Sequence, residues 1–400
     1  MSASHLYATS GALWKASRRQ AAEQTGAAVP TASRALWLST LMLLCLGALL
    51  VYSSSAVYAA RMYDDAQHFL KLQLVWGALG LAAMLALTYV PTAWFRTHAT
   101  TLLVLAMVLC VLVLIPGIGH RVGGARRWLS LGVAGFQPSE LAKVAVVIAL
   151  ASVLARREEK SGHRRTLLVP VLAAQLPVIL ILAEPDLGTA LVIELIVGAM
   201  VFAAGLPLRL LAMSGLAALP VFYHLVVGTP FRLQRLLGYI DPWAYRSTVG
   251  YQVTEALISL GSGGVMGVGL GDGKHKLFFL PEAHTDFIFA ILGEELGLVG
   301  VLVVLAAFAV LVGTGLVIAR RATHGFEAHL ALGLSLLIGV PAVFNMCVAT
   351  GLLPTKGLPL PLLSYGGSNL IATLASVGML LRISLGQRHA TASARGGSWT

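Results

Sequence analysis

Long apolar segments, separated by short polar connections, recur from about residue 35 to about residue 385. Most hold about 18 or more residues, enough for an α-helix to cross a hydrocarbon layer about 30 Å thick. Ten such segments are expected, at about residues 35–56, 70–90, 99–116, 138–155, 167–183, 187–204, 207–227, 286–319, 327–350 and 364–384. The eighth is longer than a membrane requires, so it should tilt or protrude. The pattern predicts an all-α, polytopic membrane protein with about ten transmembrane helices.

The composition agrees with this class and excludes a soluble globular protein. Of the 400 residues, 57% are hydrophobic and only 11% are charged, whereas soluble domains carry roughly 25% charged residues. The mean hydropathy is +0.83. The three cysteines, Cys45, Cys110 and Cys347, lie far apart inside apolar segments, without CxxC or Cys/His spacing. We therefore interpret them as small core residues and not as metal ligands.

Basic residues predict the orientation of the chain in the membrane. Cytoplasmic connections carry an excess of Lys and Arg, and with the N-terminus inside, the pairs at 156–157 and 320–321 fall on that side. Both termini are then cytoplasmic. The formal charge of +11 follows mainly from this topology, so nucleic-acid binding is not needed to explain it.

Three parts are predicted along the chain: a disordered basic cytoplasmic tail at 1–34, a transmembrane domain at 35–385 and a cytoplasmic tail at 386–400. Residues 228–286 form a large extracytoplasmic loop between the seventh and eighth helices. Its stretch GSGGVMGVGLGDGK is dense in glycine, which favours close backbone contact with a ligand or a re-entrant turn. It is not a P-loop, because the GK[ST] ending is missing.

Some basic residues lie on the outer side, against the orientation rule, mostly in three clusters within 120–128, 231–246 and 274–276. An anionic ligand at the outer face would explain them. The alternative is that these loops pair with outer acids such as Asp241 and Asp272.

The stretch LPEAHTDFIF at 280–289 ends in a carboxylate at the outer end of the eighth apolar segment. Asp286 has two interpretations that can hold together. It could cap the helix that follows, since an acid is favoured at a helix N-terminus. It could also be a partly dehydrated carboxylate with a raised pKa, able to take a proton from a hydroxyl group.

Other charged residues gather near the same face. PSELAK places Glu140 and Lys143 three residues apart, hence on one helix face, as an ion pair or as part of a site. AEPDLG places Glu184 and Asp186 in a tight outer hairpin. Three further acids lie in apolar segments, where charge is costly and indicates function or an internal packing contact: Glu194, Glu294 and Glu295.

The loop TGLLPTKGLPLPLLSYGGSNL at 350–370 leads into the last apolar segment. Its prolines fix a rigid, non-helical path, and YGG permits a sharp bend. Lys356 and Ser364 are candidate polar contacts for a substrate, and a purely structural role for this loop is an equal alternative.

Several of these motifs, in this order, resemble the SEDS family (shape, elongation, division and sporulation). They are GARRWLSLG, FQPSELAK, AEPDLGTA, the run from GYQ through HTDFIFAILGEELG, and GLLPTKGLPLPLLSYGGSN. The resemblance covers about residues 35–385. PEAHTDF and LLPTKGLPLP are more similar to the division branch, FtsW, than to the elongation branch, RodA.

The resemblance implies a peptidoglycan glycosyltransferase that polymerises lipid II at the outer face of the cytoplasmic membrane, at the division septum. The essential aspartate of the family falls on Asp286, its acidic and basic residues at the fourth helix fall on Arg127, Glu140 and Lys143, and its hairpin acid falls on Asp186. One departure is Glu255 in GYQVTEAL, where a small polar residue such as Ser is expected. It puts local loop contacts in doubt and leaves the chemistry untouched.

Residues and resemblance together predict a mechanism in which Asp286 is the general base for the acceptor hydroxyl. Cations would stabilise the lipid-pyrophosphate leaving group, with Arg127, Lys143, Arg232 and Arg235 as candidates. Glu140, Asp186 and His284 are expected as further substrate contacts. Inversion at the anomeric carbon requires one base and no covalent intermediate. No zinc-like cluster or organic cofactor is expected, although Mg²⁺ or Mn²⁺ could bridge phosphate oxygens.

Alternatives stay open. Ten spans and intramembrane acids also fit a lipid II flippase, although no inverted repeat is evident, and a RodA-type elongation polymerase is a second alternative. A scaffold for other wall enzymes is a third. The family implies as partners a class B penicillin-binding protein, which is a transpeptidase, and other membrane proteins of the division machinery.

Overall fold

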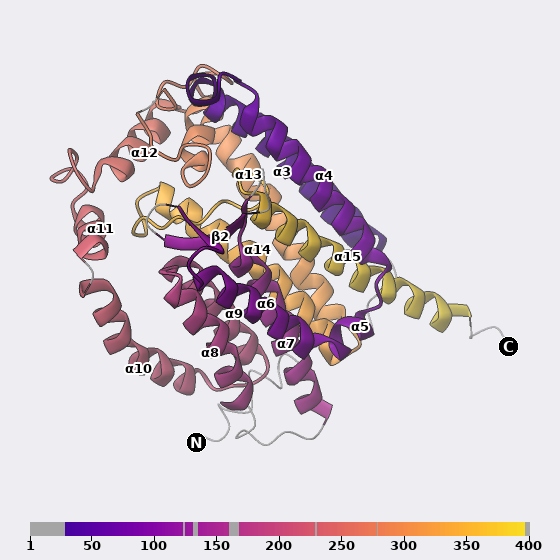
Figure 1. Cartoon of the computed structure of the whole chain (residues 1–400). Coiled ribbons are helices and arrows are strands. Elements are labelled where there is room, and N and C mark those ends of the chain that lie inside the picture. Colours follow the sequence, from indigo (N-terminus) through magenta and orange to yellow (C-terminus); the bar gives the residue numbers. More distant parts are fainter. Residues whose placement is uncertain are drawn as a thin grey trace, which may run out of the picture.

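Uninterrupted apolar sequence forms long helices throughout the computed structural model, which describes residues 29–122, 125–130, 135–159, 168–228, 230–277 and 279–396 (Figure 1). The long helices coincide with the ten predicted segments, so the fold class is confirmed. They are α3 (Val29–Tyr63), α4 (His68–Tyr89), α6 (Ala99–Leu114), α7 (Pro138–Glu159), α8 (Leu168–Ala183), α9 (Leu187–Ala203), α10 (Leu208–Val227), α13 (Ile288–Arg321), α14 (Gly325–Ala349) and α15 (Gly367–Gly396).

Within the described residues, six helices are long and apolar enough to span a membrane, and four shorter apolar helices accompany them. The chain is thus a multi-pass membrane protein. Helix α3 begins at Val29, so the last residues of the expected N-terminal tail are helical, and residues 1–28 lie outside the described part. Helix α15 continues to Gly396, through most of the expected C-terminal tail.

Shorter elements connect the spans: α5 (Thr92–Thr97), α11 (Pro230–Ile240), α12 (Tyr251–Ser262) and a small antiparallel sheet. Its strands are β1 (Gly119–Val122), β2 (Ala125–Ser130) and β3 (Gly135–Phe136), in the order β1-β2-β3, with Gly119 opposite Leu129. The sequence did not predict this sheet, because its strands are too short and too basic to show an apolar alternation.

The eighth apolar segment is not one continuous span. Helix α13 runs for 34 residues, but Gly297 interrupts it with φ 65° and ψ −164°. The backbone groups released by the break bond to the glycine-dense loop: Leu298 N–H donates to Gly264 O at 3.0 Å, and Val299 N–H to Val265 O at 3.1 Å. The extra length is therefore a separate short helix at 288–296, and the segment from 298 to 321 alone can cross the membrane.

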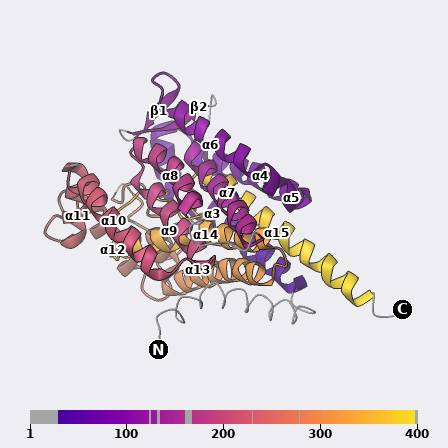
Figure 2. The same cartoon turned by 90° about the horizontal axis from the view of Figure 1, so that it is seen from below.

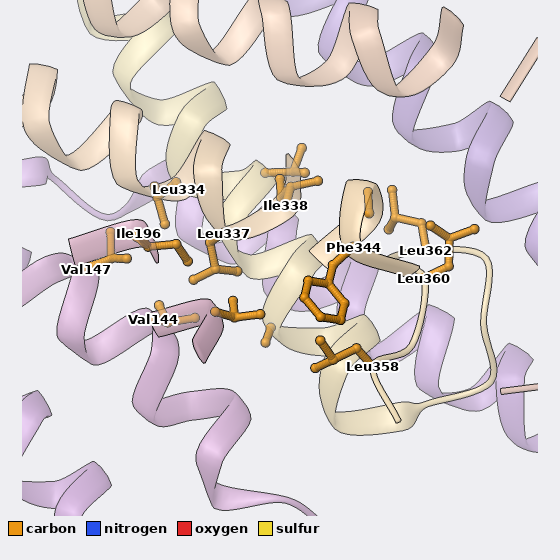
Figure 3. Packing of buried hydrophobic residues seen from close by; sticks show 14 of the residues in the cluster. Val144, Val147, Ile196, Leu334, Leu337, Ile338, Phe344, Leu358, Leu360 and Leu362 are labelled. Atoms are coloured by element: carbon orange, nitrogen blue, oxygen red, sulfur yellow. The ribbon is translucent and has the colours of Figure 1, made fainter. Parts of the chain in front are cut away.

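Helices α7 and α14 occupy the centre of the bundle. In the most apolar 18-residue stretch of each helix, 83% and 72% of the residues are buried. Figure 3 shows side chains of α7 and α9 packed against those of α14, and Phe344 of α14 beside Leu358 of the 350–366 loop. Leu358, Leu360, Leu362 and Leu363 are buried, and Pro359 and Pro361 restrict the backbone between them. These residues anchor the loop, which turns at 361–363.

Helices α10 and α11 stand apart from this bundle (Figure 1). Side chains on different sides of α10 are exposed, among them Leu210, Met213 and Leu216. Among the described elements, α9 and α11 pack against α10. Much of the surface of α10 is therefore left uncovered by the described part of the chain.

Candidate functional site

Asp286 lies two residues before helix α13, and its side chain is partly exposed. Phe287 is the N-cap residue and no side chain caps this helix, so the interpretation of Asp286 as a helix cap is wrong. The backbone of Asp286 is held from α14, because Asn345 Nδ2 donates to its carbonyl oxygen at 2.8 Å. The same amide donates to Leu358 O at 2.7 Å.

The 350–366 loop lies directly against this carboxylate. A methyl group added at Gly357 would be 3.1 Å from Asp286 Oδ2. Ser364 Oγ donates to Thr285 O at 2.5 Å and accepts from Leu360 N–H at 2.8 Å. The predicted substrate contact Ser364 therefore uses its hydroxyl to join the two loops, which is a positioning role.

The electrostatic surroundings of Asp286 suit a group that exchanges protons near neutral pH. Burial raises the pKa of Asp286 to about 7, and the nearby charge of Glu282 adds to the rise. Arg235 and Arg127 act in the opposite direction but do not cancel it. A carboxyl group with this pKa can accept a proton and release it again near neutral pH.

Near Asp286, cationic side chains from three distant parts of the chain lie close enough to change one another's pKa. Burial lowers the pKa of Lys356 to about 8, and the charges of Arg235, Arg232 and Arg127 lower it further. The pKa of Arg235 is also lowered by burial, while Asp286 raises it. The sequence predicted the basic cluster within 231–246 and Lys356 of the 350–366 loop (the proline loop) as separate features. The fold brings arginines of that cluster and Lys356 together around Asp286.

Arg127, on β2, is fixed over the 183–187 hairpin. Its guanidinium donates to Glu184 O at 3.2 Å and to Pro185 O at 2.5 Å, and lies 4.0 Å from Asp186 Oδ1. Asp186 caps α9, accepting from Thr189 N–H at 3.2 Å and from Thr189 Oγ1 at 2.8 Å. The predicted substrate contact Asp186 therefore orients the hairpin and Arg127.

The predicted pair of Glu140 and Lys143 forms a buried ion pair of 2.8 Å on α7. Asn369 Nδ2 donates to the other carboxylate oxygen at 2.9 Å. Lys143 is thereby charge-compensated, which favours the structural-pair interpretation that the sequence left open.

His284 lies in an aromatic cluster formed by α3, α4 and the proline loop. Its ring centroid is 4.6 Å from that of Phe69 and 5.9 Å from that of Tyr58. Burial lowers the pKa of His284, which favours the neutral imidazole. Tyr365 N–H donates to the His284 carbonyl at 2.9 Å. His284, predicted as a substrate contact, joins the Asp286 loop to the spans.

The outer cations at 274–276 meet acids of the chain. Lys276 Nζ lies 2.6 Å from Glu295 Oε1, and Glu295 also accepts from Ser53 Oγ at 2.6 Å. His275 Nδ1 lies 3.0 Å from Glu294. His275 and Lys276 of this cluster are thus paired within the chain, with Glu294 and Glu295 in place of the expected loop acids.

The departure from the family pattern at Glu255 also has a partner in the described structure. Glu255 Oε1 lies 3.3 Å from Arg246, a cation of the cluster within 231–246. The pair joins the start of α12 to the turn before it.

A family model described as a cell cycle protein, of the FtsW, RodA and SpoVE type, matches residues 33–389. The chain belongs to this family. A relative from Geobacter sulfurreducens, a probable peptidoglycan glycosyltransferase FtsW, is 43% identical over 348 residues, covering 87% of this chain and 93% of its own length. A relative of the same description from Hahella chejuensis is 44% identical over 354 residues, covering 86% of this chain and 88% of its own.

Solved structures agree with the family. A chain in a peptidoglycan synthase complex that coordinates polymerization and crosslinking superimposes with a TM-score of 0.72 at 31% identity, over 88% of this chain and 97% of that one. The rod shape determining protein RodA of Thermus thermophilus gives 0.64 at 30% identity, over 88% and 96%. The SEDS resemblance is confirmed, and the curated relatives are of the FtsW branch.

The sequence alone missed some residues that this FtsW/RodA/SpoVE family member uses to build the site. Asn345 was one, although an amide inside an apolar helix was a usable signal. Tyr239 is another, because its hydroxyl donates to Leu352 O at 3.0 Å and ties α11 to the proline loop. Within the described residues, no group of three His, Cys, Asp or Glu side chains could hold a metal ion.

Proposed function

We propose that this protein is a peptidoglycan glycosyltransferase that polymerises lipid II at the outer membrane face, with Asp286 as the general base. One observation carries the proposal: a partly buried carboxyl with a pKa raised to about 7 stands among cations from β2, α11 and the proline loop. The family and the relatives named FtsW support the same reaction.

In this reaction the acceptor sugar's 4-hydroxyl attacks the anomeric carbon of the donor lipid II. Asp286 takes the hydroxyl proton as the new glycosidic bond forms, an effect worth roughly 10²–10⁴ in rate. The bond to the lipid pyrophosphate breaks, and its electron pair leaves with the phosphate oxygen. The configuration inverts, so one carboxylate suffices and no covalent intermediate forms.

The cation cluster would receive the charge that develops on the leaving pyrophosphate. Lys356, with its pKa lowered to about 8 by burial and three arginines, is partly neutral without substrate. A bound pyrophosphate would raise that pKa again, because an opposite charge favours the ammonium form. Arg232 and Arg235 would bind the same group, and Arg127 would hold the hairpin side of the site.

We propose that a divalent cation used in the reaction is bound to the substrate. Mg²⁺ or Mn²⁺ would neutralise phosphate oxygens of the substrate near Asp286, whose pKa the charge of Glu282 helps to raise. The protein itself contributes proton acceptance at Asp286 and binding of the pyrophosphate by its cationic side chains.

The decisive test is Asp286→Asn, purified with a class B penicillin-binding partner and assayed for strand synthesis from lipid II. Asn keeps size and hydrogen bonding but cannot act as a base, so polymerisation should fall by at least about 10². Asp272→Asn, an exposed acid of the same loop, is the matched control and should retain activity. Equal activity in both variants would refute the assignment.

A flippase is the second candidate, favoured by ten spans and by acids in apolar segments. Two of those acids, Glu294 and Glu295, already hold His275 and Lys276, which weakens the case for a charged transport path. The Asp286→Asn protein separates the two functions, because a flippase would still move labelled lipid II across vesicle membranes. A pure scaffold would likewise tolerate the substitution.

Partner and location follow from the same proposal. A similar chain works in a complex that coordinates polymerization and crosslinking, so a crosslinking class B penicillin-binding protein is the proposed partner here. The FtsW relatives favour a division role at the septum, with other division membrane proteins, over the elongation role of RodA. Tagged protein in dividing cells should concentrate at midcell.

A further inference from the structure

A narrow apolar groove lies between α6, α7 and α8, three helices that Figure 2 shows side by side. Alanines keep it open, with Ala99 on α6, Ala149 on α7 and Ala174 on α8 along its walls. Its volume is about 160 Å³, below the roughly 300–1,000 Å³ of a pocket for a compact small molecule. Apolar spaces of this size stay dry and take apolar occupants.

The groove has the length of one membrane leaflet. Along α7 its lining runs from Val146 to Arg156, ten residue-to-residue steps that rise about 15 Å at 1.5 Å each. That is half of a hydrocarbon core about 30 Å thick. An acyl chain entering at Arg156 would therefore end near the middle of the membrane.

Neighbouring residues place the Arg156 end at the level of the lipid headgroups. Trp94 on α5 is 43% exposed and stacks on His98 with centroids 4.6 Å apart, and exposed tryptophans concentrate at the membrane interface. Ser152, which lines the groove, donates to Arg96 O at 3.3 Å. Arg156 follows one turn later, on the side predicted to be cytoplasmic.

The charge at this end suits an anion. Arg156 is exposed at the mouth of the groove. The acids beside it already have cationic or imidazole partners: Glu159 lies 2.7 Å from Arg96, and Glu158 lies 3.2 Å from His329. Arg156 therefore offers its charge to a ligand at the headgroup level.

We propose that this groove is a binding site for one anionic glycerophospholipid of the cytoplasmic leaflet. Its phosphate lies at Arg156, and one acyl chain fills the space between α6 and α8 up to Val146. The site is separate from the Asp286 site, which lies at the opposite end of the membrane-spanning helices, and does not depend on the proposed function.

Native mass spectrometry of the purified full chain tests this, with phosphatidylglycerol and phosphatidylcholine of equal chain length offered after delipidation. One phosphatidylglycerol should be retained about fivefold better than phosphatidylcholine, since one interfacial arginine contributes about 1 kcal/mol. Arg156→Gln should abolish that preference, and Ala149→Leu should remove retention of both lipids. Arg320→Gln, another exposed cytoplasmic arginine, is the matched control and should keep the preference.

Thermal unfolding separates a lipid from a free anion. Phosphatidylglycerol should raise the melting temperature of the wild-type chain and not that of Arg156→Gln. Inorganic phosphate at millimolar concentration should leave both unchanged. Equal retention of the two lipids by wild type, an unchanged preference in Arg156→Gln, or equal stabilisation by phosphate would each overturn the proposal.

Discussion

Asn345 holds the backbone of Asp286 in place, through a hydrogen bond of 2.8 Å from its side-chain amide to the Asp286 carbonyl oxygen. The amide also bonds Leu358 O, so one side chain of α14 fixes both loops that meet at the carboxylate. Asn345→Leu should lower strand synthesis by about 10- to 100-fold, because a misplacement near 1 Å costs on that order. A polymerisation assay on purified protein measures the loss.

Ser335→Ala is the control for that experiment. Ser335 is buried on the same helix, but its hydroxyl bonds only within the helix, to Ala331 O at 2.7 Å. This variant should keep nearly full activity. A similar loss in both variants would mean that α14 stability, and not the position of Asp286, governs the effect.

The pH dependence of polymerisation should be bell-shaped in kcat/KM. Asp286 acts as a base only when deprotonated, and its pKa is raised to about 7, so activity should fall as pH drops below about 7. Lys356 binds anions only when protonated, and its pKa is lowered to about 8, so activity should also fall above about 8. Initial rates at low lipid II concentration report these free-enzyme pKa values.

Lys356→Arg distinguishes the two limbs, since a guanidinium stays charged throughout this range. The alkaline limb should move to higher pH while the acid limb stays near 7. If the acid limb shifts and the alkaline limb does not, the assignments are reversed or wrong.

Lys276 and Glu295 form a buried pair with 6% and 0% of their side chains exposed. Lys276→Met should decrease the free energy of unfolding by about 3–5 kcal/mol, because it leaves a buried carboxylate without its cation. The double variant Lys276→Met, Glu295→Leu should recover much of the loss. Lys71→Met breaks the exposed pair with Asp65 and should change stability by no more than about 1 kcal/mol.

The hydrophobic pattern predicted the long helices of the fold, because a membrane-spanning helix requires a long uninterrupted apolar segment. The pair of Glu140 and Lys143 followed from helical spacing alone. The hypothesis that Asp286 is functional started from its position at the end of such a run, whereas its interpretation as a helix cap is wrong.

Contacts between distant segments could not be read from one sequence. No local sequence pattern shows that Arg235, far from Lys356 in the chain, lies close enough to lower the pKa of Lys356. Ser364 and Asp186 were predicted to face substrate, but their oxygens bond the chain itself. Local residue type indicates polarity, whereas the partner of a polar group depends on packing that the sequence pattern does not contain.

Gly297 illustrates the same limit and supports a last prediction. Its φ of 65° separates the short helix at 288–296 from the membrane span, and an added methyl group would meet the Gly267 nitrogen and the Val265 carbonyl. Gly297→Ala should therefore destabilise the chain and reduce polymerisation, because it displaces the glycine-dense loop from α13. Gly313→Ala, in the same helix with open space around it, should be neutral or stabilise by up to about 1 kcal/mol. Melting temperature and strand synthesis measured on both variants decide this, and equal behaviour of the two would contradict a specific need for the break at 297.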